Sequence, residues 1–185
     1  MVLLAMSSVG QTYHNLASGS FTQDWTNTSL ITTDDNWSGV PSIIGFLGGD
    51  ITTGIGVDPQ TLLGEGTITI DVNANKNNPN TYTSGGVTEF EITNPVIALQ
   101  GSGTADAPNI IIYLNTIGVS NLQVQYLLRD IDGSADNAVQ AVALQYRIGS
   151  SGNFTNLAAG FVADASSGPS LATLETQVNV SLPAT

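Results

Sequence analysis

Oxygen-bearing side chains alternate along one short segment: Asp130, Asp132, Ser134 and Asp136, with a glycine between the second and third. Carboxylate and hydroxyl oxygens are the ligands that Ca²⁺ prefers, and alternate side chains around a glycine can converge on one cation. The segment departs from the EF-hand loop, because the position of the final bidentate Glu is occupied by Ala141. The pattern therefore suggests calcium as a cofactor. The alternative is a plain hairpin turn at Asp132-Gly133 in which Asp130 pairs with Arg129 or Arg147.

A second group of acids, Asp34-Asp35-Asn36 with Asp50 and Asp58, has similar chemistry and poorer spacing. Asp residues also favour turns and solubility, so their surplus over Glu has a simpler interpretation than metal binding. Both interpretations remain open for this second group.

Three aromatic residues lie among polar neighbours and are candidates for stacking against sugar rings: Trp25, Trp37 and Tyr82. Trp37 lies in a loop rich in Gly, Pro and Asp, and Tyr82 lies in a loop rich in Asn and Thr. A Trp flanked by polar residues more often packs into the core, which is the favoured interpretation for Trp25. Trp37 and Tyr82 are therefore the predicted ligand-binding residues, with the core as the alternative for Trp37.

Catalytic chemistry has few residues to draw on. The chain has no Cys and one His, His14, and it lacks the Gly-x-Ser-x-Gly motif of serine hydrolases. Zinc, phosphate-loop and dinucleotide patterns are also missing. Two convergent carboxylates of a glycosidase remain conceivable, but such a cleft is usually lined by several aromatic side chains. The sequence predicts that this protein is not an enzyme.

The charge is strongly negative, with 3 Lys and Arg against 15 Asp and Glu and a net charge of −12. Such a chain repels phosphate backbones and anionic lipid, so nucleic acid is not expected as a partner. No apolar run approaches the ~20 residues of a membrane span, so membrane insertion is not expected.

Alternating and β-branched runs dominate the chain from residue 11 to the end. Candidate strands cover 20–25, 42–47, 67–73, 87–92, 95–100, 109–115, 121–129, 138–148 and 172–182, with Gly-rich and Asn-rich turns between them. This pattern predicts an all-β fold, an antiparallel β-sandwich or jelly roll of about nine strands, in one domain over 11–185. A short helical turn is expected at 58–63, where Asp58 can cap and Pro59 can begin it.

Two finer expectations follow from the patterns. The segments 121–129 and 138–148 are predicted to form a long antiparallel hairpin at the centre of the fold. The run of Ile110, Ile111 and Ile112 is apolar on both faces, so this strand is expected to be covered on both sides.

Residues 1–10 are apolar and end in small residues before a polar one. They resemble the second half of a signal peptide, with Ser8-Val9-Gly10 at the cleavage position, although the basic start of such a peptide is missing. The alternative is an ordinary apolar first strand.

Four segments, Asp34–Ser42, Pro108–Asn115, Leu128–Asn137 and Gln145–Phe154, resemble an uncharacterised β-sandwich module of large secreted bacterial proteins. Some of those proteins also carry extracellular-nuclease, lamin-tail-like or surface-anchoring parts. The resemblance implies secretion and an accessory or adhesive role, and it assigns no activity and no site residues. Similar modules continue past Pro183 with another strand, so we expect either a fragment or a sandwich that lacks its closing strand.

Together these observations predict a secreted, non-catalytic interaction or adhesion module of the cell surface or extracellular matrix. Its expected partners are another extracellular protein or a polysaccharide. One alternative is a carbohydrate-binding module. The other is a structural subunit of an extracellular filament that assembles by strand donation at an open sheet edge.

Overall fold

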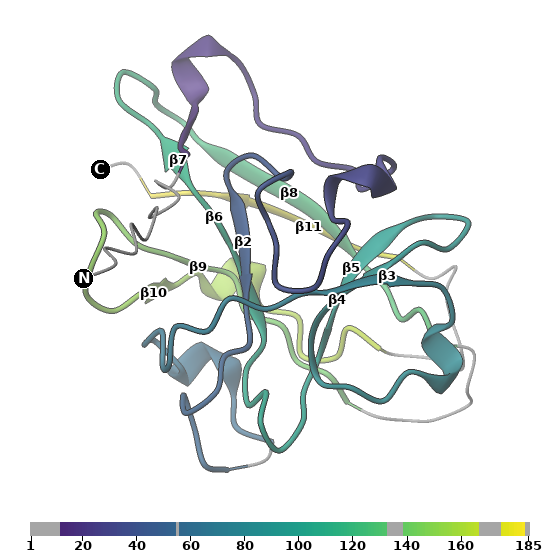
Figure 1. The fold of residues 1–185 in the computed structure, drawn as a ribbon. Coiled ribbons are helices and arrows are strands. Elements are labelled where there is room, and N and C mark those ends of the chain that lie inside the picture. Colours follow the sequence, from purple (N-terminus) through teal and green to yellow (C-terminus); the bar gives the residue numbers. More distant parts are fainter. Residues whose placement is uncertain (1–11, 55, 133–138, 167–174, 184–185) are drawn as a thin grey trace, which may run out of the picture.

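A computed structural model describes residues 12–54, 56–132, 139–166 and 175–183 of the chain (Figure 1). Within this part the chain forms short β-strands joined by long loops, with single-turn 3-10 helices and no α-helix. The strands are β1 (His14–Asn15), β2 (Ile43–Phe46), β3 (Asn73–Lys76), β4 (Gly86–Phe90), β5 (Val96–Gln100), β6 (Asn109–Ile112), β7 (Leu114–Asn115), β8 (Gln123–Leu128), β9 (Gln145–Tyr146), β10 (Thr155–Asn156) and β11 (Thr176–Ser181). The 3-10 helices are η1 (Leu16–Ser18), η2 (Thr28–Leu30), η3 (Pro59–Thr61), η4 (Pro79–Thr81) and η5 (Ala158–Gly160). The fold is therefore β-rich.

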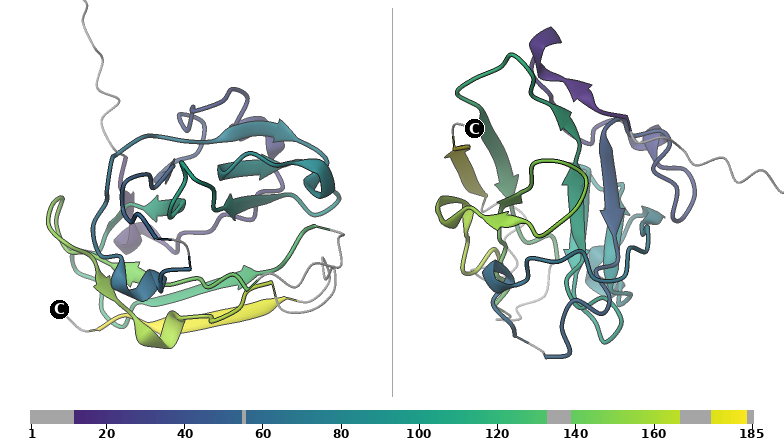
Figure 2. Two further views of the ribbon diagram at one scale, coloured as in Figure 1. Left: turned by 90° about the horizontal axis from the view of Figure 1, so that it is seen from below. Right: turned by 90° about the vertical axis from the view of Figure 1, so that its left-hand side faces the viewer.

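Across the described ranges, the strands pair in several small sheets. Antiparallel pairs join β2 to β6, β4 to β5, β8 to β11 and β9 to β10. The pairs β1–β7 and β3–β4 are parallel, so the expectation of wholly antiparallel pairing is wrong for these two. A parallel pair needs a connection that returns the chain to the same end, and the loop with η4 does this between β3 and β4. The ribbon of β8 and β11 lies on one side of the molecule and the β3–β4–β5 sheet on the other (Figure 2).

Most predicted strands lie where the sequence pattern places them, since β2, β4, β5, β6, β8 and β11 fall within or close to the expected ranges. The strand predicted at 20–25 is wrong, because this segment is a loop in which Trp25 has a left-handed φ of 61°. The range 67–73 contributes a single bridge at Ile70 and the first residue of β3.

The central hairpin predicted between 121–129 and 138–148 is also wrong. β8 pairs instead with β11, with Val178 opposite Tyr126 and Val180 opposite Val124, whereas β9 pairs with β10. The half-buried alternation predicted for β8 is confirmed. Alternation states which face of a strand is buried, and it does not state which other strand lies alongside.

The strand of three isoleucines is covered less than its composition predicts. In β6, Ile111 is half-buried, whereas Ile110 and Ile112 are 36% and 42% exposed. Among the described strands β6 pairs only with β2, which leaves the other edge of β6 without a neighbouring strand. The expectation of cover on both faces is therefore wrong.

The short helical turn predicted near residue 58 is confirmed as η3. Pro59 occupies its first position, and the Asp58 carboxylate accepts a hydrogen bond from the Gln60 N–H at 2.9 Å. Capping and a fixed proline φ are local effects, which explains why the sequence alone predicts them.

The core gathers around β2, β3 and β4 and the loop that precedes β2. Its buried members are Ile31, Trp37, Val40, Ile43, Val72, Ala74 and Val87. A Cβ on Gly45 of β2 would lie 2.5 Å from Cζ2 of Trp37 and 2.8 Å from the Asp71 carbonyl oxygen. Only glycine permits this close approach, so the Trp37 ring packs directly on the backbone of β2.

Candidate functional site

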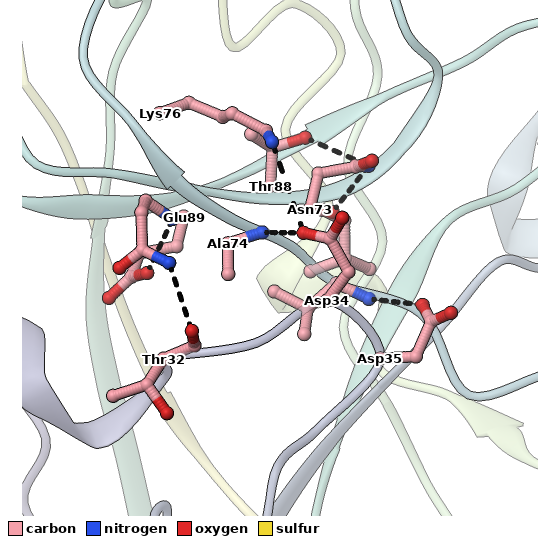
Figure 3. A network of polar contacts seen from close by, with 11 residues as sticks. Thr32, Asp34, Asp35, Asn73, Ala74, Lys76, Thr88 and Glu89 are labelled. Carbon is pink, nitrogen blue, oxygen red and sulfur yellow. Dashed lines mark hydrogen bonds and ion pairs between the residues drawn. The ribbon is translucent and has the colours of Figure 1, made fainter.

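Polar side chains join the loop before Trp37 to the edge of β3 (Figure 3). The Asp34 carboxylate accepts a hydrogen bond from the Ala74 N–H at 2.7 Å. Asp35 donates its own N–H to the Val72 carbonyl oxygen at 2.9 Å, and its carboxylate accepts from the Val72 N–H at 3.3 Å. These two acids therefore take the place of a strand beside this edge, because they satisfy backbone groups that another strand would otherwise pair.

A second set of contacts holds the far end of β3. The side-chain amide of Asn75 donates to the Thr32 carbonyl oxygen at 3.3 Å, and its backbone N–H donates to the Glu89 carboxylate at 3.0 Å. Glu89 is only 6% exposed, and burial raises the pKa of its carboxyl group. Lys76 lies 3.9 Å from the Asp34 carboxylate. The buried Glu89 thus serves the backbone of β3 rather than an open site.

Asp71 links this network to the core. Its carboxylate accepts a hydrogen bond from the Val87 N–H at 2.6 Å, and its carbonyl oxygen accepts from Nε1 of Trp37 at 3.0 Å. Burial raises the pKa of the Asp71 carboxyl group, and the nearby charges of Asp35 and Asp34 raise it further. Removal from water disfavours the charged form, and like charges add to that cost.

The second acid cluster predicted from the sequence divides among separate structural contacts. Asp34 and Asp35 bind the β3 edge, Asp58 caps η3, and the Asp50 carboxylate accepts from the Thr67 hydroxyl at 2.7 Å. Over the described ranges, no group of three or more His, Cys, Asp or Glu is placed to hold a metal ion.

The predicted calcium segment is only partly within the described residues. The Asp130 carboxylate accepts a hydrogen bond from the Asp132 N–H at 3.0 Å, which forms a local turn. Ser134 and Asp136 lie outside the described residues, so calcium at this segment stays a prediction. Arg147, one of the arginines considered as a partner of Asp130, forms an ion pair with Glu65 at 2.8 Å.

The structure corrects the prediction of Trp37 as a ligand-binding residue and supports its core alternative. Its side chain is 5% exposed, its Nε1 donates to Asp71, and its ring meets Trp25 edge-on with centroids 6.3 Å apart. A sugar ring needs an exposed aromatic face, and Trp37 has none. The prediction was wrong because Asp34 and Asp35, which precede Trp37 in the sequence, bind backbone groups of the β3 segment and do not surround an open site.

Tyr82 lines a hollow of about 210 Å³ at the surface beside β3 and η4. The ring of Tyr82 is half-buried, packs edge-on against Phe90 at 5.6 Å, and lies 5.9 Å from Nζ of Lys76. The other lining residues are Asn75, Lys76, Asn77, Asn78 and Thr81. Amides, a hydroxyl and an aromatic edge are the groups that bind sugar hydroxyls and ring faces, so the prediction for Tyr82 remains open.

The ribbon of β8 and β11 presents a further surface that the sequence motifs do not reveal. Its outward side chains are all exposed: Gln123, Gln125 and Leu127 from β8, and Gln177, Asn179 and Ser181 from β11. We call these six residues the amide face. Neither strand contains a charged residue, although the chain carries a net charge of −12. The sequence shows each half of this face as an alternating pattern, but only the β8–β11 register brings the halves together.

No protein family, curated protein or solved structure matches the chain. In the described part of the molecule, no helix has the length and apolar character needed to cross a membrane. The resemblance of four segments to a secreted bacterial module therefore stays a prediction.

Proposed function

We propose that this chain is a secreted, non-catalytic β-sandwich of the jelly-roll type that acts as an interaction or adhesion module at the cell surface or in the extracellular matrix. The observation that carries the proposal is the amide face, an exposed and charge-free surface on a strongly acidic protein. Amide and hydroxyl groups donate and accept hydrogen bonds without a charge that must be neutralised, which suits an extracellular protein or a neutral polysaccharide as partner.

The environment of the acidic residues supports a non-catalytic role. Asp34, Asp35, Asp71 and Glu89 each accept a hydrogen bond from a backbone N–H, so their geometry is explained by the fold. A general acid or base needs a proton-transfer path to a substrate, and these carboxylates are directed at the chain itself. Nε2 of the single histidine, His14, lies 3.0 Å from the Gly19 carbonyl oxygen.

The cations support the expectation that nucleic acid is not a partner. Lys76 lies beside Asp34, and Arg147 is paired with Glu65. Phosphate binding depends on basic side chains that replace the counterions of the backbone. Two of the three basic residues are thus already near carboxylates.

Adsorption of the labelled full chain to surfaces coated with cellulose, chitin or collagen tests the proposal. We expect retention on at least one coating and a loss of roughly tenfold or more for Gln125→Glu, which places a charge on the amide face. The matched control is Gln100→Glu, an equally conservative change at an exposed position on β5. Retention that is absent from every coating, or equally reduced by both variants, would contradict the proposal.

A second candidate function, carbohydrate binding, is favoured by the hollow around Tyr82. If a sugar occupies this hollow, glycan-array binding should be lost in Tyr82→Ala. It should be kept in the control Tyr13→Ala, because Tyr13 is 50% exposed and does not line the hollow. Binding that survives Tyr82→Ala would remove this hollow as the sugar site.

Calcium belongs to the proposal as a stabilising ion at Asp130, Asp132, Ser134 and Asp136. Carboxylates that share a cation repel one another without it, so calcium should raise the midpoint of thermal unfolding above the value in EDTA. An unchanged midpoint, or an equal shift in Asp132→Ala, would exclude calcium at this segment.

A further inference from the structure

The hydrogen-bond pattern shows which backbone groups of β11 face away from β8. The ladder continues past the end of the strand, where the Leu182 N–H donates to the Leu122 carbonyl oxygen at 2.9 Å. Backbone direction alternates along an antiparallel strand, so Val178 and Val180 also direct their N–H and C=O groups to β8. Gln177, Asn179 and Ser181 therefore direct theirs to the opposite edge.

This opposite edge has no strand beside it within the described residues, because β11 pairs only with β8. The 3-10 helix η5 lies against β11, and the Tyr126 hydroxyl donates to the Gly160 carbonyl oxygen at 3.4 Å. The Tyr126 side chain is on the same face as buried Val178, so η5 covers the inner face of the ribbon. Within the described ranges, the outward groups of this edge are therefore available to pair with another chain.

We propose that β11 pairs with β11 of a second copy of this chain, antiparallel, about a two-fold axis through Asn179. The inference rests on the proposed interaction function and names one partner for the same ribbon. In this register Asn179 lies opposite the second copy's Asn179, and Gln177 lies opposite Ser181. The three residues whose backbone groups face outward thus meet each other, so every such N–H and C=O finds a partner.

Side chains and charges are compatible with this register. Val178 of one copy lies opposite Val180 of the other on the inner face, which extends the apolar layer across the axis. The acid nearest to the axis along the sequence, Glu175, lies four positions from Asn179, so its two copies are about 27 Å apart along the strands. That separation exceeds the Debye length of about 8 Å at physiological salt, so the like charges are screened.

The symmetry of the contact distinguishes this assembly from strand donation. A two-fold contact uses the same patch on both copies and closes as a dimer, whereas a filament needs a head-to-tail contact that does not close. The result is a four-stranded sheet in which the two amide faces form one continuous surface.

Disulfide trapping in the full-length chain tests the register, because the protein contains no cysteine of its own. Residues opposite each other in a hydrogen-bonded antiparallel pair have Cα atoms about 5.5 Å apart, which suits a disulfide. We therefore expect Asn179→Cys to form a covalent dimer under mild oxidation. Ser181→Cys is the matched control, because its two copies would lie roughly 14 Å apart along the strands and cannot be bridged.

The expected result is cross-linking of Asn179→Cys at least about tenfold faster than of Ser181→Cys, with wild-type sedimentation that shows a monomer–dimer equilibrium. Asn179→Pro, which removes the central N–H without removing a bond to β8, should be monomeric with an unchanged circular dichroism spectrum. Equal cross-linking rates, no cross-linking, or a wild-type monomer at every concentration would overturn the pairing. If adsorption to the coated surfaces persists in these cases, the interaction function stands and only the β11 pairing fails.

Discussion

Two strand edges of the molecule, at β3 and at β11, differ in how their backbone groups are covered. The edge of the β3 segment is covered by side chains, since Asp34 and Asp35 bind the N–H groups of Ala74 and Val72. The edge of β11 has no such cover among the described residues, and exposed Asn179 lies at its centre.

Backbone groups at a strand edge can be satisfied by side chains of the same chain, as at β3, or left uncovered, as at β11. Carboxylates at β3 satisfy the backbone but are brought close together, and Asp71 beside them is partly removed from water. At β11 there is neither a lysine nor a proline within the strand to repel another chain. Proteins usually protect exposed edges with such residues, so an unprotected edge indicates a place for association.

The largest effect should come from Trp37→Ala, which removes the ring that packs on β2 and anchors the loop carrying Asp34 and Asp35. Loss of a fully buried aromatic side chain costs about 3–5 kcal/mol of unfolding free energy. Urea denaturation measures this loss. Leu127→Ala on the amide face is the control, and it should change stability by less than about 0.5 kcal/mol because Leu127 is 57% exposed. Similar losses in both variants would show that the two regions do not differ as described.

A smaller effect is expected for Asp34→Ala, which leaves the buried Ala74 N–H without its acceptor. The expected loss is about 1–2 kcal/mol in the same denaturation experiment. Glu175→Ala removes the same charge from an exposed position, so it corrects for the relief of charge repulsion. If Asp34→Ala is no less stable than Glu175→Ala, the carboxylate does not hold the β3 edge.

The pH dependence of stability should be smaller still and should have a defined sign. The pKa of Asp71 and of Glu89 is raised in the folded state by burial, so the folded chain binds these protons more tightly than the unfolded chain. The contribution of these two carboxyl groups to the free energy of unfolding is fully present below their ordinary pKa. It is lost as pH rises through their raised pKa in the folded state. The free energy of unfolding should therefore fall as pH rises from the ordinary carboxylate pKa through the raised pKa of these two groups, and Asp71→Asn should make that fall less steep.

Asp24→Asn provides the control for the pH experiment. Hydrogen bonds from Thr26 lower the pKa of the exposed Asp24, so its titration affects stability only at lower pH. An equal change of slope in Asp24→Asn and Asp71→Asn would contradict the assignment of the pH dependence to the buried carboxylates.

Local patterns predicted much of this fold. The positions of β2, β4, β5, β8 and β11 follow from alternation and turn residues, and η3 follows from Asp58 and Pro59. These features depend on neighbours in the sequence. The sequence could therefore predict these features without information on which strands pair with each other.

The sequence could not predict in the same way which distant strands pair with each other. Nothing in the alternation of β8 distinguishes β11 from the 138–148 segment as its partner, and the predicted hairpin failed for that reason. The environment of Trp37 was misjudged because its polar neighbours bind β3, which follows it by more than thirty residues. The amide face likewise exists only in the β8–β11 register.

Amide hydrogen exchange at several protein concentrations tests the difference between the two edges most directly. The N–H groups of Val178, Val180, Val72 and Ala74 should be protected at every concentration, because each is bonded within one chain. Those of Gln177, Asn179 and Ser181 should exchange rapidly in dilute solution and become protected as the concentration rises. Protection of these three amides that is equally strong in dilute solution would show that the β11 edge is closed within the monomer, and would contradict the account.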